Sequence, residues 1–291
     1  MEIISNKILM RHNARETWGE GSYRIANIEF SNIDLSPEDL SIAETHAEIV
    51  HSRDYLNELM IHSDFESPLA EISMSKDTYT HALSAVSLSI MAAQPLLEEK
   101  EGKFALVRPP GHHASKEKAE GFCLLNNVAC ATEYLVLNGM RMAILDIDLH
   151  HGNGTQSIFY DRPDVLYVSI HNCDIYPHTG HEKETGNGLG KGFTINYPVS
   201  GKLSSEKYLA ILQKAMNDII VYAPEAIAVS VGFDTYRQDR LNQGMWDLEL
   251  DDFGEIGRLI KRANIPFFCV LEGGYHHDID SCLKKFVNGS K

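Results

Sequence analysis

Short apolar segments that end in polar, glycine-rich residues recur after residue 100, and this recurrence constrains the fold more than any other feature. Helical patterns separate several of them, at residues 124–138, 204–222 and 248–263. Strands alternating with helices favour an α/β fold with a mostly parallel sheet and helices on both faces. In such sheets, ligands bind at the carboxyl ends of the strands. The six segments are FALVRPP (104–110), MAILDIDLH (142–150), VLYVSIH (165–171), FTINYPV (193–199), AIAVSVGFD (226–234) and IPFFCVLEGGY (265–275).

The first hundred residues have mostly helical and loop-like patterns. The helical segment 36–60 begins with Ser36 as a plausible N-cap and Pro37 at the first helical position. Segment 77–99 has the pattern of an amphipathic helix. Because we find no internal repeat and no linker, we expect one domain over residues 1–291.

The charge balance restricts the partners that the chain can bind. It has 41 acidic and 26 basic residues and a net charge of −15, which disfavours nucleic acid and anionic membranes and suits cationic substrates. The five cysteines form no C-x-x-C pair, which indicates a reducing compartment. The first residues lack the apolar core of a signal peptide, and no uncharged apolar run approaches about 18 residues. We therefore expect a cytoplasmic protein; a homo-oligomer stays an open alternative.

The segment ILDIDLHHGNG (144–154) places Asp146, Asp148 and His150 at alternate positions. Alternate residues of a strand share one face, and three ionisable groups on a buried face are costly unless a cation compensates them. Asp234 ends another apolar segment and is expected at the same edge of the sheet. Asp148, His150 and Asp234 would form a metal site with positions left open for water and substrate. Asp146 would orient a ligand or a nearby histidine; the alternative is a strand end with ordinary ion pairs.

Two further motifs supply groups for amide hydrolysis. In RPPGHHAS, a rigid turn precedes His112 and His113, which could serve as general base and general acid. In LEGGYHHD, Gly273 lets the backbone approach a ligand, and Tyr275 offers a phenol that could polarise a carbonyl group. Surface histidines and an ordinary turn are the alternatives for each motif alone. Taken together, the motifs indicate metal-assisted hydrolysis of an amide.

Seven motifs follow one another along the chain: RPPGHHA, GFCLLNNVA, LDIDLHHGNGTQ, VSIHN, YPHTG, VGFDTYRQDRL and LEGGYHHD. In these motifs the chain resembles the histone deacetylase superfamily, which includes acetylpolyamine amidohydrolases and bacterial histone deacetylase-like amidohydrolases. The resemblance runs from about residue 45 to the end, is closest to the class II and bacterial branches, and implies the arginase–deacetylase fold. Residues 1–45 form a divergent segment, in which RHNARETWGEGSYR (11–24) replaces the family's usual histidine–proline–glutamate opening.

The resemblance implies one Zn²⁺ per chain, bound by Asp148, His150 and Asp234. Fe²⁺ and Co²⁺ suit the same donors. Arginases on this fold use two manganese ions and need a second aspartate in a D-x-D motif, where this chain has Tyr236. The missing acid favours one metal ion.

The resemblance also implies the catalytic groups. His113 is expected to act as general base and acid, oriented by Asn153 where some relatives have aspartate. His112 is expected to be its electrostatic partner, hydrogen-bonded to Asp146. Tyr275 is expected to stabilise the transition state.

A structural K⁺ and a substrate tunnel follow from the same resemblance. The residues implied for the K⁺ site are Asp146, Asp148, His150 and Ser169. The residues implied for the tunnel, which would pass a long methylene chain between apolar walls, are Gly121, Phe122, Tyr176, Leu241 and Gly273.

We therefore expect a zinc-dependent deacetylase that converts an acetyl-lysine side chain or an acetylpolyamine to the free amine and acetate. Leu241 stands where a specialised polyamine deacetylase of the class II branch has glutamate, which favours acyl-lysine. A two-metal ureohydrolase and a non-catalytic module that binds acylated lysine are the alternatives. Intact metal ligands, His113 and Tyr275 argue against the module. The acyl chain length stays open.

Overall fold

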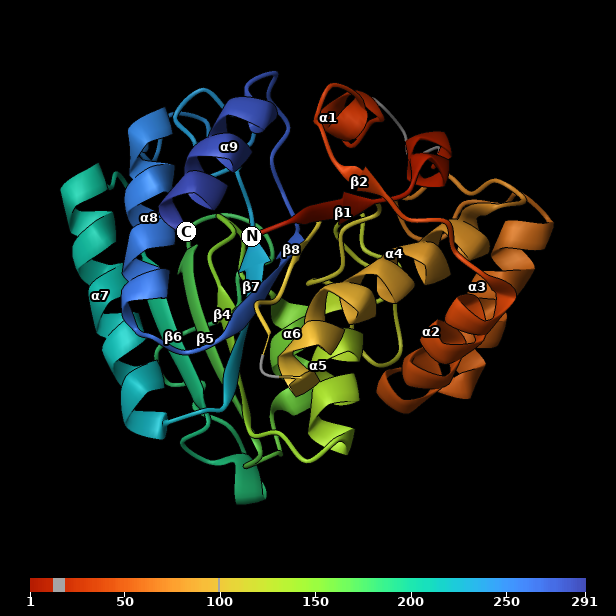
Figure 1. Ribbon diagram of the computed structural model, residues 1–291, viewed down its shortest axis with the longest axis horizontal. Coiled ribbons are helices and arrows are strands. Elements are labelled where there is room, and N and C mark those ends of the chain that lie inside the picture. Colours follow the sequence, from red (N-terminus) through yellow and green to blue (C-terminus); the bar gives the residue numbers. More distant parts are fainter. Residues whose placement is uncertain (13–18, 99) are drawn as a thin grey trace.

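A single eight-stranded sheet runs through the computed structural model, which describes residues 1–12, 19–98 and 100–291 (Figure 1). Its strands are β1 (Ile3–Ser5), β2 (Ser31–Asn32), β3 (Phe104–Ala105), β4 (Met142–Asp146), β5 (Val165–Asn172), β6 (Thr194–Val199), β7 (Ala226–Val231) and β8 (Phe267–Leu271). The strand order is β2-β1-β3-β8-β7-β4-β5-β6, and every neighbouring pair is parallel. The predicted parallel α/β architecture is confirmed.

Helices cover both faces of the sheet. In Figure 1, α7, α8 and α9 lie on one side of the sheet and α2 to α6 on the other. The α-helices are α1 (Tyr23–Ala26), α2 (Pro37–Val50), α3 (Arg53–Asp64), α4 (Thr78–Ala93), α5 (Asn127–Leu137), α6 (Asn153–Phe159), α7 (Ser205–Tyr222), α8 (Leu250–Arg262) and α9 (Ile279–Gly289). Short 3₁₀ helices are η1 (Lys7–Arg11), η3 (Gln94–Glu98) and η4 (Gly188–Gly190).

The segment 36–60 forms parts of two helices. Ser36 caps α2 as expected, through a capping box with Asp39. His51 then adopts an extended backbone that ends α2, and the side chain of Ser52 accepts the N–H of Tyr55 and starts α3. A second capping serine, placed where the first helix ends, therefore divides the helical pattern.

Contrary to the expectation from the sequence, one segment, Thr78–Glu98, which comprises α4 and η3, is long and apolar enough to cross a membrane by length and composition alone. However, 72% of its most apolar window is buried inside the fold. It contacts α2, α5 and β3 and forms part of the core beside the sheet.

Four of the six predicted strands, β3, β4, β7 and β8, end earlier than the sequence predicts, whereas β5 and β6 end at Asn172 and Val199, within one residue of the predicted ends. β4 stops at Asp146, so the expectation that Asp146, Asp148 and His150 share a strand face is wrong. Beyond the strand, side-chain oxygens take the place of ladder partners: Asp146 Oδ1 accepts the N–H of Asp148 at 3.2 Å, and Asp148 Oδ1 accepts that of His150 at 2.9 Å. A curled loop, and not strand alternation, therefore places these side chains. Asp234 likewise lies three residues beyond the end of β7.

Candidate active site

The three predicted metal ligands converge at the carboxyl edge of the sheet. Each offers one donor atom, and the three atoms lie within 4.8 Å of one another. His150 Nδ1 lies 2.8 Å from Asp234 Oδ2 and 3.3 Å from Asp148 Oδ1. Because β4 and β7 are neighbours in the sheet, the loops that follow them bring the two carboxylates together.

This donor set fits a divalent cation. Both carboxylates are buried, and burial together with the charge of Asp148 raises the pKa of Asp234 to about 7. Burial also opposes the charge of Asp148, but His112 and His150 outweigh it and lower the pKa of that carboxyl group. Two acids this close and without solvent need a compensating positive charge, and carboxylate and imidazole donors suit Zn²⁺, Fe²⁺ or Co²⁺.

Gly273, which was expected in the tunnel, lies against the metal ligands. Its N–H donates to Asp148 Oδ2 at 2.7 Å. A Cβ atom at this position would stand 2.6 Å from both Asp148 Oδ2 and Asp234 Oδ2. The close approach of the two carboxylates therefore requires glycine here.

The adjacent histidines have opposite protonation tendencies. His112 Nδ1 lies 3.1 Å from Asp146 Oδ2, as the sequence predicts. Burial opposes a charge on His112, but the carboxylates of Asp148 and Asp146 outweigh it and raise its pKa to about 10. His113 has a pKa well below its ordinary value because of burial and the neighbouring His112 and His150. The opposite pKa shifts favour the neutral form of His113 over that of His112, which suits His113 as the proton acceptor.

Asn153 orients His113. His113 Nδ1 lies 2.7 Å from Asn153 Oδ1. An amide oxygen only accepts hydrogen bonds, so Nδ1 carries the proton and the lone pair stays on Nε2. Asn153 is the first residue of α6, and the loop between β4 and α6 therefore places both the metal ligands and this partner.

A cavity of about 330 Å³ adjoins these groups. Four of the predicted tunnel residues line it: Gly121, Phe122, Tyr176 and Leu241. Gly121 has a φ of +56°, and a Cβ atom there would stand 2.3 Å from His113 Cδ2, so glycine keeps the wall clear of the histidine ring. The other lining residues are Glu71, His113, His150, Ile175, Gln243 and Tyr275.

Tyr275 lies in the wall of this cavity, and two neighbouring residues fix its position. Its ring is in edge-to-face contact with Phe122, with a centroid distance of 5.8 Å, and its N–H donates to Asp239 Oδ2 at 2.5 Å. Burial raises the pKa of Tyr275 well above its ordinary value, so the phenol stays protonated at neutral pH. A protonated phenol is a hydrogen-bond donor toward an oxygen that gains charge.

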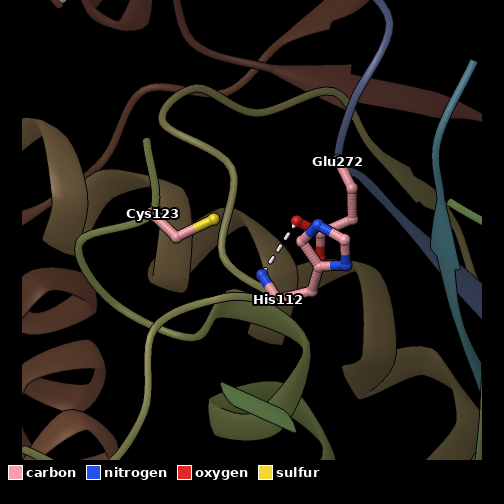
Figure 2. A group of neighbouring side chains, drawn as sticks. All are labelled: His112, Cys123 and Glu272. Atoms are coloured by element: carbon pink, nitrogen blue, oxygen red, sulfur yellow. Dashed lines mark hydrogen bonds between the residues drawn. The ribbon is translucent and has the colours of Figure 1, made fainter. Parts of the chain in front are cut away.

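Glu272 supports the turn that carries the histidine pair. Figure 2 shows its carboxylate beside His112, with Cys123 nearby. Glu272 Oε2 accepts the N–H groups of Gly111 at 2.7 Å and His112 at 3.0 Å, and Oε1 accepts the hydroxyl of Ser230 at 3.1 Å. Burial raises the pKa of Glu272 to about 7. Because these three bonds already occupy its oxygens, we interpret Glu272 as a structural acceptor and not as a second metal ligand.

The residues of the expected K⁺ site also come together. Ser169 on β5 stands directly opposite Asp146 on β4, and both are buried. The Ser169 hydroxyl lies 2.9 Å from His171 Nδ1. The loop that follows Asp146 contains the other two residues, Asp148 and His150.

Several contributors to the site were not predicted. Glu71 lies at the cavity, and Arg24 donates from Nε to the oxygen of Gly274 at 2.6 Å and from Nη2 to the oxygen of Glu272. Arg24 is the last residue of RHNARETWGEGSYR, whose residues 13–18 lie outside the described ranges. An acid at a strand end, as in LEGGY, could have indicated Glu272, but no local pattern distinguishes Glu71 or Arg24.

The sequence and the fold both match known proteins. Residues 23–289 match the model of the histone deacetylase domain. An acetylpolyamine amidohydrolase of Mycoplana ramosa is 39% identical over 210 residues, which are 71% of this chain and 61% of that protein. A probable deacetylase of Methanothermobacter thermautotrophicus is 40% identical over 234 residues, 75% of this chain and 70% of that one. The chain thus spans about three fifths of the first acetylpolyamine amidohydrolases that it matches.

Solved structures share the whole fold. The crystal structure of an acetylpolyamine aminohydrolase from Burkholderia pseudomallei superposes with a TM-score of 0.86 at 28% identity. The match covers 99% of this chain and 98% of that one. The shared fold therefore extends over nearly all of both chains.

Proposed function

This chain belongs to the histone deacetylase family and has its arginase–deacetylase fold, and we propose that it is a zinc-dependent deacetylase of acetylated primary amines. The observation that carries the proposal is the convergence of the Asp148–His150–Asp234 donor set, a neutral His113 and a protonated Tyr275 on one cavity. The reaction adds water to the amide and yields a free amine and acetate. We also propose that residues 1–291 act as one domain, because the single sheet takes strands from the N-terminal segment as well.

A divalent metal held by Asp148, His150 and Asp234 would supply Lewis-acid activation of water and of the acetyl carbonyl group. His113 Nε2 accepts the proton of the attacking water, and Asn153 holds the imidazole in the form that can do so. The Tyr275 phenol donates to the carbonyl oxygen as it gains negative charge. The proton on His113 then passes to the leaving nitrogen, so that the amine departs neutral and takes up its last proton from water.

His112 supports this sequence without taking part in proton transfer. Its imidazole is buried between Asp146 and Asp148, and these carboxylates raise its pKa. The positive charge beside His113 keeps His113 neutral before the reaction. A structural K⁺ near Asp146 and Ser169 is part of the proposal.

We propose a small acetylated polyamine as the preferred substrate. Relatives named acetylpolyamine amidohydrolase support this choice. Among the described lining residues, the cavity has a carboxylate, Glu71, and no lysine or arginine, which favours a cation beyond the acetamide. An acetyl-lysine side chain is the second candidate, because Leu241 offers an apolar contact to a methylene chain.

The five cysteines are free and four of them are buried, which supports a reducing, cytoplasmic location within this proposal.

The test is turnover of N8-acetylspermidine, acetylputrescine and an acetyl-lysine peptide, each with zinc and potassium supplied. We expect all three to react, with a preference of about tenfold or more for an acetylpolyamine. Tyr275→Phe should lower kcat by about 100-fold or more, since a lost oxyanion donor costs that much. A chelator should abolish turnover. A zinc-loaded protein that hydrolyses no acylated amine would refute the proposal, and a peptide preference would establish the second candidate.

A further inference from the structure

Beyond His113, the hydrogen bonds continue to a carboxylate that the proposed chemistry does not use. Asn153 Oδ1 faces His113 Nδ1 at 2.7 Å, and Asn153 Nδ2 donates to Glu120 Oε2 at 3.1 Å. Asn153 therefore stands between the imidazole and Glu120. The side chain of Glu120 is 22% exposed and also pairs with Lys118, whose Nζ lies 2.9 Å from Oε2.

An asparagine amide has two chemically different ends of nearly equal shape. If its oxygen faces Nδ1 of His113, the imidazole carries its hydrogen on Nδ1 and keeps its lone pair on Nε2. If its NH₂ group faces Nδ1, the hydrogen moves to Nε2, and Nε2 can no longer accept a proton. A neutral asparagine alone does not choose between these arrangements, whereas an aspartate would.

The hydrogen bond to Glu120 favours one of these two orientations of the amide. A carboxylate accepts hydrogen bonds and donates none, so it binds only the NH₂ end of Asn153. Turning the amide would place the amide oxygen against the carboxylate and lose the hydrogen bond to Glu120, and the bond to His113 would persist only with the imidazole hydrogen on Nε2. We propose that Glu120 is a positioning residue that fixes the orientation of Asn153 and thereby the Nδ1–H tautomer of His113; this rests on the proposed function, in which His113 accepts a proton at Nε2.

The loop that carries Glu120 is itself fixed against His113. Glu120 and Cys123 exchange backbone hydrogen bonds of 3.2 Å and 2.9 Å. The N–H of Gly121 donates to Glu71 Oε1 at 2.6 Å. Gly121 also packs so closely on the imidazole that a Cβ atom would stand 2.3 Å from His113 Cδ2. The carboxylate is therefore presented to Asn153 by a turn that the active site already holds in place.

A double-mutant cycle tests the proposal in the zinc-loaded enzyme. Glu120→Ala should lower kcat about tenfold and leave KM nearly unchanged, because the base is present in its competent tautomer less often. In an Asn153→Asp background, the new carboxylate selects the tautomer by itself, and Glu120→Ala should cost nothing or raise kcat by removing a like charge. The exposed Glu117 lies on the same loop and provides the matched control, Glu117→Ala, which should change neither constant. Equal losses in both backgrounds would overturn the proposal.

A spectroscopic readout does not depend on turnover. In protein labelled with ¹⁵N-histidine, the signals that disappear in His113→Ala identify the ring nitrogens of His113. We expect Nδ1–H in the native protein and in Glu117→Ala, and a mixture of tautomers in Glu120→Ala. An unchanged Nδ1–H spectrum in Glu120→Ala would refute the role of Glu120. A native protein that shows the tautomer but has no deacetylase activity would instead refute the proposed function.

Discussion

Arg24 packs on one face of the Tyr275 ring, with its guanidinium carbon 4.7 Å from the ring centre. The guanidinium also donates to the backbone oxygens of Gly274 and Glu272, which belong to the same loop as Tyr275. Glu20 holds Arg24 in turn, with Oε1 3.0 Å from Nη1. The N-terminal segment, which is divergent in sequence, therefore stabilises the loop that contains Tyr275 through Arg24.

Replacing Arg24 should weaken both the fold and the reaction. Arg24→Met keeps the length of the side chain but leaves two buried carbonyl groups without donors and Glu20 with one cation fewer. We expect the free energy of unfolding to fall by about 3 kcal/mol, as when a buried ion pair loses one partner. We also expect kcat to fall, because Tyr275 loses its support. Urea unfolding and steady-state turnover measure the two effects.

Arg53 provides the control, because it is 79% exposed and its nitrogen lies 3.5 Å from Glu48. Arg53→Met should change the free energy of unfolding by less than about 1 kcal/mol. An Arg24→Met enzyme with native stability and native kcat would show that the contact with Tyr275 has no function.

Removal of the metal should destabilise the protein. Asp148, His150 and Asp234 bring two buried acids together, and a bound cation compensates their charge. A ligand that binds only the folded state at 1,000 times its Kd adds about 4 kcal/mol of stability. We therefore expect a chelator to lower the Tm by several degrees, and zinc to restore it.

The metal content distinguishes the deacetylase from a two-metal ureohydrolase. Tyr236 occupies the position of the second acid, and its ring packs against Phe253 and His276 and not at the metal ligands. Elemental analysis should give one zinc per chain, and none in Asp234→Ala. Two tightly bound metal ions per chain would contradict the single-metal assignment. The exposed Asp54 offers a control, since Asp54→Asn should retain the metal.

The sequence predicts the core of this structure well because burial leaves a strong local pattern there. The helices at 204–222 and 248–263 were expected almost as they occur, at Ser205–Tyr222 and Leu250–Arg262. The short β1 and β2 were missed, because three and two residues are too few to form a pattern. The ends of β3, β4, β7 and β8 were predicted too late. For β4, the reason is that an apolar residue in a curled loop, such as Ile147, is as buried as one on a strand.

The sequence predicts a site residue when its side chain has a chemical group suited to the role. It does not predict a residue whose role depends only on contacts in the folded structure. Asp148, His150 and Asp234 carry donor groups beside apolar strands, so their role is visible without a structure. Glu120 and Arg24 are ordinary charged residues in sequence. Glu120 contacts Asn153, which is 33 positions away in the sequence, and Arg24 contacts Gly274, which is 250 positions away. A single sequence does not indicate which distant residues come into contact.

Acid should destabilise the fold through His51. Its imidazole is buried, with Nδ1 2.8 Å from the oxygen of Ser115 and Nε2 accepting the N–H of Asn126 at 3.0 Å. Burial lowers the pKa of His51 to about 4, against 6.5 for the ordinary group. Between these values the unfolded chain binds the proton and the folded chain does not, so stability is complete above pH 6.5 and falls as the pH drops toward 4. The loss from this one group is about 3 kcal/mol.

His51→Gln isolates this contribution, because glutamine can donate and accept but does not titrate. Urea unfolding of both proteins should be compared at pH 7.5 and pH 4.5. We expect the loss of stability on acidification to be smaller in the variant by roughly 2–3 kcal/mol. The same pH dependence in both proteins would show that other groups, such as the buried His171, cause the acid sensitivity.

Glu71 should set the affinity for cationic substrates. Its carboxylate lies at the cavity, and Oε1 accepts the N–H of Gly121 at 2.6 Å. Glu71→Gln keeps an oxygen for this bond and removes only the charge. We expect the KM for N8-acetylspermidine to rise about fivefold, which corresponds to about 1 kcal/mol for a partly screened ion pair, while kcat stays the same. The effect should shrink at high salt because the carboxylate is exposed to solvent.

A neutral substrate separates charge from structure at this position. N-butylacetamide has the acetamide and a methylene chain but no ammonium group, so Glu71→Gln should leave its KM unchanged. The exposed Glu66, five residues away, provides the control for long-range charge, and Glu66→Gln should have little effect on either substrate. If both substrates lose affinity equally in Glu71→Gln, Glu71 acts only through its bond to Gly121. The preference for a cation would then have to come from the overall acidic surface, which a salt titration of wild-type KM would reveal.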